Sequence, residues 1–479
     1  MAIEDIITDY TRAKDLIRAN TLFKASNSEY DGIQMVLNYT HVMESVVKDL
    51  FNMSANGIKG IGVFLYGSLG RKEMVSESDV DMLILHEEKG EGTYKEIKTR
   101  FKQYVKPFQF CKIDLPEWGN LAEAEIFARK SITEGNQVLE ARFLSGDRTI
   151  ANKVEDIQKM YASPERMVRN IVFQKFYFEQ YFKQRVREGN VNVKYCHGGS
   201  RDLMFISWFD TLMSRKYDNW KQTKSESPAA LVGLLNLYNN GLIDALTLSR
   251  DIEALNFNLI LRNEILQANK GTFDEGLTFM DDITAMKVFS RISDFMGYMK
   301  IRNHQELREE FNRQRKHIND VKSLIWNQMI TEKSKVFGAK WGCDFKRAYA
   351  ESTPEKERAK IAKTDDLLIR IAAIWGATNS GQQRLLRKLM EKERDTDSWE
   401  IQASFATSPF CTPDYLHHLG TGLAKEIGYG YILRIICRNP NVSMETLKNI
   451  ANDTSLESRY KQLAETALEH GKDAANHQV

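Results

Sequence analysis

Residues 61–85 read IGVFLYGSLGRKEMVSESDVDMLIL, and this stretch sets the fold of the N-terminal part of the chain. Its first seven residues are apolar and rich in β-branched and aromatic side chains, then stop at glycine, as is typical of a buried strand. Val80 to Leu85 has the same texture and predicts a second strand after a polar turn. Phe108 to Leu115, which follows a helical pattern over Thr93 to Val105, predicts a third. Together they predict a small α/β unit with a mixed sheet.

Helical spacing of apolar residues dominates the rest of the chain. Residues 1–55 predict two amphipathic helices, and the helical pattern resumes at Leu121 and runs to about Trp326. We therefore expect an α+β fold that is mostly α. A chain of 479 residues exceeds one hydrophobic core. The expected domains are an α/β domain with N-terminal helices over residues 1–150, a helical domain over 151–335 and a helical-repeat module over 336–479.

A faint internal repeat lies in the C-terminal part. Two segments share a loop proline, then a Ser or Thr near an expected helix start, then apolar positions three apart, and each position recurs 31 residues later. The first segment has Ser408, Pro409, Thr412, Leu416 and Leu419, and the second has Asn439, Pro440, Ser443, Leu447 and Ile450. This pattern is similar to leucine-rich-variant or HEAT-like helical repeats, in which each unit buries its face on its neighbour. Two ordinary helices with proline-marked starts are the alternative.

Charge and cysteine content narrow the class of protein. Lys and Arg number 67 and Asp and Glu number 65, which is too balanced for a surface that coats nucleic acid, so we expect no nucleic-acid partner. The five cysteines are dispersed without a CxxC pair, which favours a reducing cytoplasm over a zinc site or a disulfide framework. The opening MAIEDIITDY carries acids where a signal peptide needs bases, and no apolar run reaches the roughly 18 residues that span a bilayer. We expect a cytoplasmic protein without membrane association.

The polar turn between the first two predicted strands carries residues suited to phosphate chemistry. Asp79 and Asp81 are two apart at a strand, so their side chains face one side with Cα atoms about 7 Å apart, a span that two carboxylates close around magnesium. Gly67 permits a tight turn and the close approach of phosphate, and the Ser68 hydroxyl with nearby N–H groups binds phosphate oxygens. A nucleoside triphosphate needs such a combination of metal ions and close donors.

An arginine and a third carboxylate complete the predicted site. Arg71 either pairs with phosphate or holds Glu73 and the loop in place. Asp114, on the third predicted strand, is the candidate that completes the catalytic and metal-binding set with Asp79 and Asp81 around magnesium, or manganese in its place. A lone Asp-Val-Asp is most often a solvated turn, but here eight defined positions fall in order within fifteen residues. They are Gly67, Ser68, Gly70, Arg71, Glu73, Ser78, Asp79 and Asp81.

At these positions the sequence resembles the polymerase-β-like nucleotidyltransferase superfamily, whose pattern is GS or GG, a spacer with R and E, then SDxD. Within it, the form GSLGRKE followed by SDVDMLIL is similar to bacterial protein-PII uridylyltransferases. Residues 135–147, GNQVLEARFLSGD, are similar to that family's TxLLEARxLxGD helix. Residues 192–203, NVKYCHGGSRDL, are similar to its NxKxxxGGLRDI loop, which glutamine synthetase adenylyltransferases share in altered form. The resemblance covers roughly residues 60–325.

The resemblance implies a helical region beside the transferase domain, and a set of residues that border the nucleotide or protein-substrate cleft. That set is Lys194, Gly198, Gly199, Arg201 and Asp202. A Gly-Gly turn tied down by an Arg and Asp pair is also a common loop anchor, and this alternative stays open. The expected nucleotide-binding residues are Gly67, Ser68, Arg71, Glu73, Lys194, Gly198, Gly199 and Arg201.

We expect the chain to depart from the full uridylyltransferase family. It has no His-Asp doublet of a metal-dependent hydrolase, and no βαββαβ pattern of paired ACT domains follows the helical region. The helical repeats take their place and are expected to hold a protein substrate or partner. The expected function is transfer of a nucleoside monophosphate from UTP or ATP to a protein side chain. The alternatives are a small molecule or another nucleotide as the acceptor, and a non-catalytic scaffold with a relic transferase domain.

Overall fold

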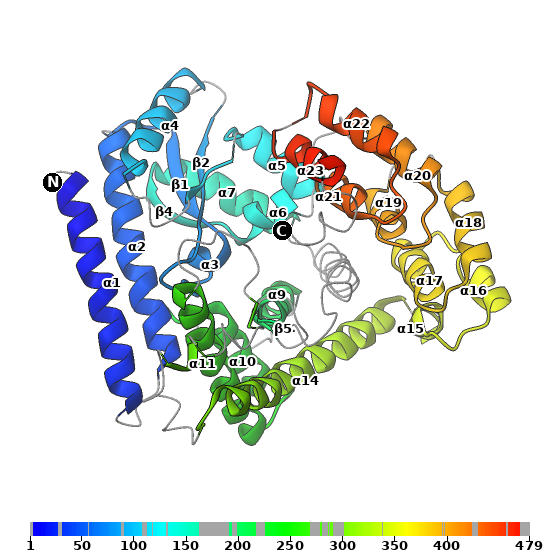
Figure 1. Ribbon diagram of the computed structural model, residues 1–479, viewed down its shortest axis with the longest axis horizontal. Coiled ribbons are helices and arrows are strands. Elements are labelled where there is room, and N and C mark those ends of the chain that lie inside the picture. The colour runs from blue at the N-terminus through cyan, green and yellow to red at the C-terminus, as the bar shows by residue number, and fades with distance from the viewer. Residues whose placement is uncertain are drawn as a thin grey trace. The chain divides into compact units, whose positions relative to one another are not determined.

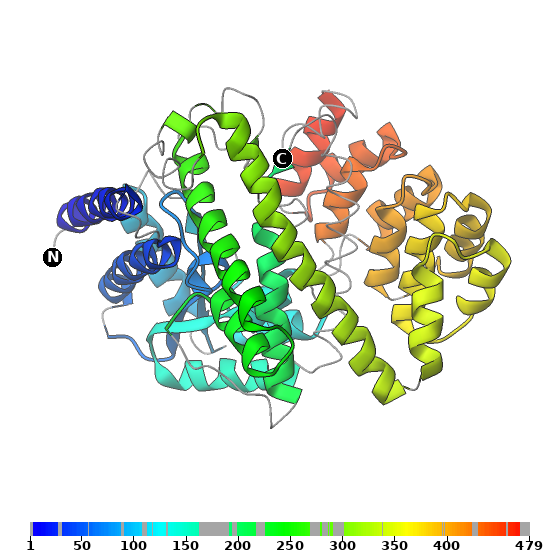
Figure 2. The same ribbon diagram turned by 90° about the horizontal axis from the view of Figure 1, so that it is seen from below.

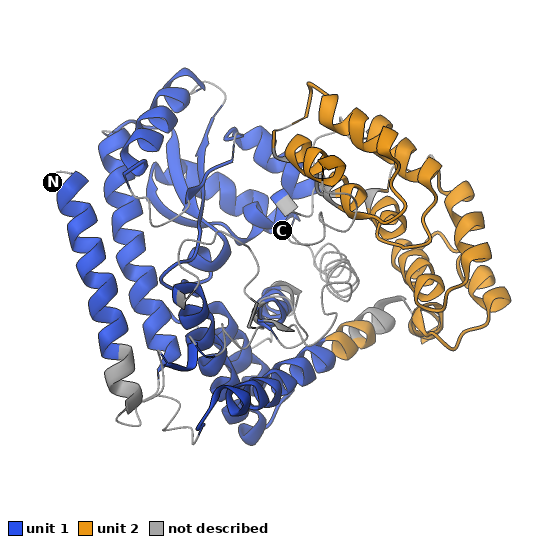
Figure 3. Cartoon of the chain, viewed as in Figure 1, with its two compact units in different colours: residues 1–167, 188–325 blue, residues 168–187, 326–479 orange. Residues whose placement is uncertain are grey.

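The chain divides into two compact units (Figure 3). Unit 1 comprises Met1–Met167 and Glu188–Ile325, and unit 2 comprises Val168–Arg187 and Trp326–Val479. The computed structural model describes residues 3–26, 31–55, 57–87, 91–107, 113–116, 118–130, 133–161, 191–193, 199–216, 226–268, 278–279, 286, 288–290, 301–337, 339–394, 396, 398–423, 430–456 and 458–469. The expected division of the first part into residues 1–150 and 151–335 stays a prediction, because both stretches contribute to unit 1.

Unit 1 combines a small sheet with helices on both of its faces (Figure 1). Its elements in chain order are α1 (Ile3–Ser26), α2 (Gly32–Ala55), β1 (Ile61–Leu65), α3 (Gly67–Gly70), β2 (Val80–His86), α4 (Glu91–Val105), β3 (Ile113–Asp114), α5 (Leu121–Lys130), α6 (Thr133–Glu140), β4 (Arg142–Gly146), α7 (Arg148–Tyr161), β5 (Val191–Asn192), α9 (Ser200–Lys216), α10 (Ala229–Asn239), α11 (Ala245–Ala268), β6 (Thr278–Phe279) and the first part of α14 (His304–Phe337). The two N-terminal helices and the mostly helical α+β fold predicted from the sequence are confirmed.

The main sheet has the order β3-β2-β1-β4. β1 pairs antiparallel with β2 and β4, whereas β2 pairs parallel with β3, so the predicted mixed sheet is confirmed. The first two predicted strands form as expected, because each is a short apolar run bounded by polar turns. Of the predicted strand Phe108 to Leu115, the structure has β3 at Ile113–Asp114, and residues 108–112 lie outside the described residues.

Alternation along the strands divides the core into two layers. One face of the sheet packs against α1, α2 and α4, and the other against α5, α6 and α7. In β2, Val80 and Met82 enter the first layer, whereas Leu83 and Leu85 enter the second. Because successive side chains on a strand point to opposite faces, Asp81 at the start of β2 points to the same side as Leu83.

The segment 135–147 differs from the helix that the resemblance implied. α6 ends at Glu140, and Arg142 to Gly146 form strand β4, which pairs antiparallel with β1. The apolar residues of this segment support either interpretation locally. Pairing with β1 decides the outcome, since the strand satisfies the backbone groups along an otherwise open sheet edge.

The helices of the second half of unit 1 gather around α11. α11 packs on α2 and α10, and the amide of Ile33 donates to Asn256 Oδ1 at 3.0 Å. A buried ion pair joins α14 to α9, with Lys322 Nζ 2.9 Å from Asp202 Oδ2. Figure 2 shows the green helices α10 and α11 lying close together with α14. These contacts bring α9 and α11 to the same part of unit 1 as the turn after β1.

Unit 2 is a succession of stacked helices, in which α17 packs on α15, α19 on α17, α21 on α19 and α23 on α21. Its elements after α14 are α15 (Ala339–Tyr349), α16 (Glu355–Ile361), α17 (Leu367–Asn379), α18 (Gln383–Lys392), α19 (Trp399–Ala406), α20 (Pro413–His418), the π-helical turn η2 (Leu419–Leu423), α21 (Gly430–Arg438), α22 (Met444–Asn452) and α23 (Ser458–Glu469). In the described part of the chain, no helix is both long and apolar enough to cross a membrane.

The predicted repeat is visible as equivalent caps and equivalent core positions. The hydroxyls of Thr412 and Ser443 accept hydrogen bonds from the first turns of α20 and α22, as the 31-residue offset predicted. Leu416 and Leu447 are both fully buried. Between neighbouring loops, Asn439 Nδ2 donates to the Ser408 carbonyl oxygen at 2.9 Å, so matching positions of successive repeats touch one another.

Candidate active site

The turn after β1 is shaped by a glycine whose backbone no other residue type adopts easily. Gly67 has φ +61°, in the left-handed region. A Cβ atom added there would overlap the Asp81 carboxylate and stand 2.8 Å from its Cγ atom. The Tyr66 amide donates to the Asp81 carbonyl oxygen at 3.1 Å, which ties the turn to the start of β2. A side chain at position 67 would therefore fill the space directly in front of the Asp81 carboxylate.

Arg71 is held in a network of buried partners. Its Nε donates to Glu73 Oε2 at 3.1 Å and its NH1 donates to Glu140 Oε2 at 2.8 Å. Trp208 Nε1 of α9 donates to the other oxygen of Glu140 at 2.6 Å. Burial lowers the pKa of Arg71, but attraction to Glu140 and Glu73 outweighs it and raises the pKa above the usual value. Of the two predicted roles of Arg71, the geometry favours the one in which it holds Glu73 and the loop.

The loop between the turn and β2 is docked on the helical region. Glu73 Oε1 accepts a hydrogen bond from the Ala230 amide of α10 at 3.1 Å. The Ser76 amide donates to Asn263 Oδ1 of α11 at 3.1 Å, and Gln267 Nε2 donates to Ser76 Oγ at 2.9 Å. Two helices that follow far along the chain therefore fix the segment that carries the predicted metal ligands.

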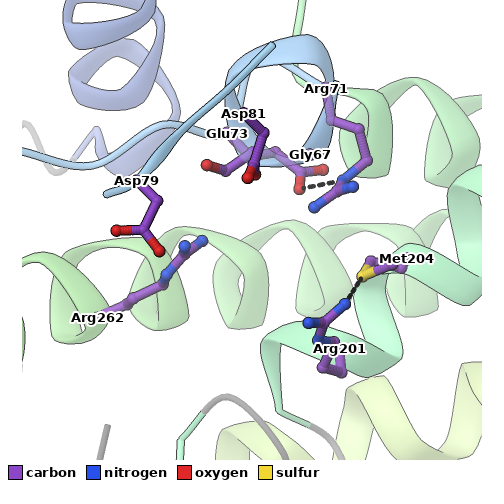
Figure 4. Close-up of a pocket in the computed structure, with 9 residues that line it drawn as sticks. Gly67, Arg71, Glu73, Asp79, Asp81, Arg201, Met204 and Arg262 are labelled. Carbon is purple, nitrogen blue, oxygen red and sulfur yellow. Dashed lines mark hydrogen bonds and ion pairs between the residues drawn. The ribbon is translucent and has the colours of Figure 1, made fainter. Parts of the chain in front are cut away.

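A polar pocket lies between this loop and the helices α9 and α11 (Figure 4). Its walls include three arginines and three acids and contain no aromatic side chain among the described residues. They are formed by Gly67, Ser68, Arg71, Glu73, Asp79, Asp81, Arg201, Met204 and Arg262. Such a lining suits phosphate groups and cations, because each charge has an opposite charge within reach.

Asp79 and Asp81 contribute the acidic side of the pocket. Asp79 immediately precedes β2 and is exposed, whereas Asp81 is the second residue of β2 and half-buried. Buried Ser78 and Val80 flank Asp79 and fix the chain on both sides. Two carboxylates at one pocket wall fit Mg²⁺, which is usually bound by one or two carboxylates together with substrate phosphates. The residues present therefore fit the predicted metal.

Asp114 lies next to Asp81 but outside the pocket lining. β3 pairs parallel with β2 so that Asp114 is directly opposite Asp81 in register. Its side chain is exposed, and the described residues contain no group of three acids, histidines or cysteines placed to hold one metal ion. The role of Asp114 as third carboxylate stays a prediction.

Of the predicted residues in the 192–203 loop, one lines the pocket and another stabilises the packing of the helices. Arg201 lines the pocket, and its NH1 contacts Met204 Sδ at 3.3 Å. Asp202 pairs with Lys322 rather than with Arg201, so this carboxylate anchors α9 to α14. Gly199 accepts a hydrogen bond from the Asp202 amide and is buried, while Lys194 and Gly198 lie outside the described residues.

The sequence motifs did not predict Arg262, although its side chain lines the pocket from α11. Burial lowers the pKa of Arg262 to about 10, opposed by attraction to Glu73 and Asp79 and reinforced by repulsion from Arg71 and Arg201. A guanidinium with that pKa remains charged at neutral pH. No motif surrounds Arg262 in the sequence, so its contribution depends on how α11 docks.

Comparison with protein families agrees with this geometry. A family model described as nucleotidyltransferase domain matches residues 46–132, which include Gly67, Asp79 and Asp81. The fold and the pocket together define a nucleotidyltransferase domain. More particularly, residues 178–326 match the family described as GlnD PII-uridylyltransferase, so this segment of the chain is similar to that family. Arg201 and Arg262 belong to this second segment, and the pocket is built by both.

Curated relatives resemble part of the chain. A bifunctional uridylyltransferase/uridylyl-removing enzyme of Haemophilus influenzae is 30% identical over 156 residues, which is 31% of this chain and 17% of that protein. Proteins of the same description are 27% identical over 191 residues in Pasteurella multocida and 21% identical over 210 residues in Nitrosospira multiformis. The matches cover 38% and 41% of this chain, and 21% and 22% of those proteins. The chain thus spans about a fifth of the length of these relatives.

Proposed function

We propose that this chain is a magnesium-dependent nucleotidyltransferase that moves a nucleoside monophosphate from UTP or ATP to a protein side chain. The observation that carries the proposal is the pocket in which Asp79 and Asp81 stand beside the left-handed turn at Gly67. A protein acceptor is supported by the match to the PII-uridylyltransferase family over residues 178–326. We place the reaction in the cytoplasm, where thiols stay reduced, because Cys343, Cys411 and Cys437 are free.

Each part of the pocket has a role in the proposed reaction. The backbone at Gly67 and the hydroxyl of Ser68 bind phosphate oxygens of the triphosphate. Asp79 and Asp81 hold the metal, and bound magnesium, or manganese in its place, supplies positive charge that neutralises the phosphate oxygens. Lys194, Gly198 and Gly199 are proposed as further nucleotide contacts from the helical region.

The proposed transfer conserves atoms and charge. An oxygen of the acceptor side chain forms a bond to the α-phosphorus of the triphosphate. The bond from that phosphorus to the bridging oxygen of the β-phosphate breaks, and pyrophosphate leaves. Asp114, beside Asp81 in the sheet, is proposed to take the proton of the acceptor hydroxyl.

Labelling with radioactive nucleotides tests the proposal. A cell lysate is incubated with the purified chain, magnesium and either α-labelled UTP or α-labelled ATP, and labelled proteins are detected after electrophoresis. Asp81→Asn is expected to lower labelling at least about a hundredfold, because the metal loses a charged ligand. Asp156→Asn, an exposed aspartate on α7 far along the sequence, is the matched control and is expected to label as the wild type does. Labelling that survives Asp81→Asn contradicts the proposed metal site.

The nature of the acceptor is tested separately. Products of the same reaction are separated into protein and small-molecule fractions by filtration and chromatography. Label that stays with protein supports a protein side chain as acceptor. Label that appears only in a small molecule or a dinucleotide keeps the transferase chemistry but overturns the protein acceptor. A chain that binds no triphosphate in the presence of magnesium would instead be a scaffold with a relic transferase domain.

A further inference from the structure

The three arginines of the pocket are not equivalent in their hydrogen bonding. Arg71 donates from Nε and from NH1 to two different carboxylates, at 3.1 and 2.8 Å. Its side chain, Glu73 and Glu140 are each at most 15% exposed, so these ion pairs are largely shielded from water. Drawing Arg71 onto a phosphate would leave two buried carboxylates without their cation, which is strongly unfavourable. Arg71 is therefore committed to the fold of the loop.

Arg262 has the opposite character. Its NH2 is 3.5 Å from Ser78 Oγ, a separation at the outer limit of a hydrogen bond. Its Nε atom is buried and finds no acceptor among the described residues. A buried guanidinium with spare donors is costly unless an acceptor arrives, so such an arginine in a pocket points to an anionic ligand.

The backbone that carries Arg262 is firmly placed. Its neighbour Asn263 is fully buried and binds the Ser76 amide, and Gln267 one turn further on binds the Ser76 hydroxyl. In Figure 4 the side chain of Arg262 extends from α11 toward Asp79, on the acidic side of the pocket. A backbone held in place and a guanidinium group with unsatisfied donors are the features expected of a preorganised phosphate-binding residue.

We propose that Arg262 binds the triphosphate oxygens of the nucleotide, and that Arg71 is a positioning residue. This inference rests on the proposed function and adds the residue that recognises the phosphate chain. In the proposed site Asp79 and Asp81 bind the metal, and Arg71 neutralises Glu73. Arg262 then supplies positive charge to the phosphates from the pocket wall formed by α11. The nucleotide site is then complete only when α11 is docked on the loop at Ser76.

Binding of magnesium tripolyphosphate to the full chain tests the assignment of Arg262. This probe has the phosphate chain of the substrate but no base or ribose, and its Kd is measured by titration calorimetry. Arg262→Gln is expected to raise the Kd about tenfold or more, as loss of a charge-assisted hydrogen bond does. Arg262→Lys, which keeps the charge but not the planar fork, is expected to raise it less. Arg250→Gln, an exposed arginine on the same helix, is the matched control and should bind as the wild type does.

The outcomes separate the inference from the proposed function. Wild-type chain that binds tripolyphosphate, with an unchanged Kd in Arg262→Gln, overturns the assignment of Arg262 and leaves the transferase proposal standing. Wild-type chain that binds neither tripolyphosphate nor a nucleoside triphosphate overturns both. If Arg262→Gln does not fold, as judged by its melting temperature, the Arg262→Lys variant decides, since a Kd equal to that of the wild type would leave no role for the guanidinium fork.

The role of Arg71 has its own readout. Arg71→Lys keeps a charge but loses the fork that holds Glu73 and Glu140 together. It is expected to lower kcat while the Kd for magnesium tripolyphosphate stays within about twofold, because the loop shifts but the phosphate ligand remains. A rise in Kd as large as that of Arg262→Gln would make Arg71 a phosphate ligand and overturn the division of roles.

Discussion

At the residue scale, the backbone conformation of Gly67 determines how much space the Asp81 carboxylate has. Several glycines of unit 1 have positive φ, including Gly57 at +76° and Gly60 at +79°, but nothing lies within 4 Å of a Cβ placed at either of them. At Gly67 the same Cβ would overlap the Asp81 carboxylate. The sequence predicted glycine here for its turn and for phosphate approach. The tertiary structure adds that the missing side chain leaves room for the metal ligand itself.

Replacing Gly67 by alanine therefore adds a steric effect to a backbone effect. Left-handed backbone alone costs an alanine roughly 1 kcal/mol, so Gly57→Ala is expected to lower the free energy of unfolding by about that amount and to leave nucleotide transfer unchanged. Gly67→Ala is expected to lower transfer at least about a hundredfold as well, because the Asp81 carboxylate must move. Denaturant unfolding and initial rates of labelling check both. Equal rates in the two variants would contradict the predicted role of the turn.

At the scale of elements, α11 and α14 meet over a buried carboxyl group. Asp251 of α11 is 2% exposed, and its Oδ2 atom has no hydrogen-bond partner among the described residues. It lines a groove with Asp320 and His317 of α14. Burial, and then repulsion from Asp320, raises the pKa of Asp251 to about 7. We therefore expect the packing of these two helices to depend on pH.

The sign of that sensitivity follows from the raised pKa. Between about pH 4 and 7 the folded chain keeps a proton on Asp251 that the unfolded chain has lost, so stability falls as the pH rises through this window. The unfolding free energy should fall from pH 5 to pH 8, and this fall is expected to be about 2–3 kcal/mol smaller in Asp251→Asn. Urea unfolding at several pH values measures this in a His317→Gln background, because His317 lines the same groove as Asp251.

The control for this prediction is an acid that immediately precedes the same helix and has the opposite pKa shift. The Thr247 amide donates to Asp244, and this lowers the pKa of Asp244 below its usual value. Its titration is complete below pH 5, so Asp244→Asn should leave the slope between pH 5 and 8 unchanged. A slope that is the same in Asp251→Asn and in its parent would show that Asp251 does not control the helix contact.

Prediction of elements from the sequence was accurate where a pattern is local. β1 and β2 were expected because each is a continuous apolar run, and the caps Thr412 and Ser443 because a hydroxyl precedes an apolar repeat. The family resemblance implied a helix over residues 135–147, whereas Arg142–Gly146 form β4 because pairing with β1 selects the strand. The repeat also extends further upstream than expected, since buried Leu385 lies 31 positions before Leu416.

At the scale of the whole molecule, every described residue that lines the pocket belongs to unit 1. Magnesium and a nucleoside triphosphate are therefore expected to slow amide hydrogen exchange in residues 67–81, 200–204 and around 262, because bound ligand reduces local opening. The helices α17 to α22 should exchange at the same rate with and without ligand. Exchange measured by mass spectrometry checks this, with Asp81→Asn as the control that should show no protection. Slowing of equal size in unit 2 would contradict a site confined to unit 1.

The sequence by itself determined strands β1 and β2, the glycine-serine turn, the pair Asp79 and Asp81 and the mostly helical character of the remainder. These features depend on neighbours within a few residues, so composition and spacing are enough to define them. Only the tertiary structure decided that Arg71 is bound by Glu73 and Glu140, and that Arg262 reaches the pocket. These facts depend on contacts between segments far apart in the chain, and long-range packing of α9 and α11 leaves no periodic signal at the residues it brings together.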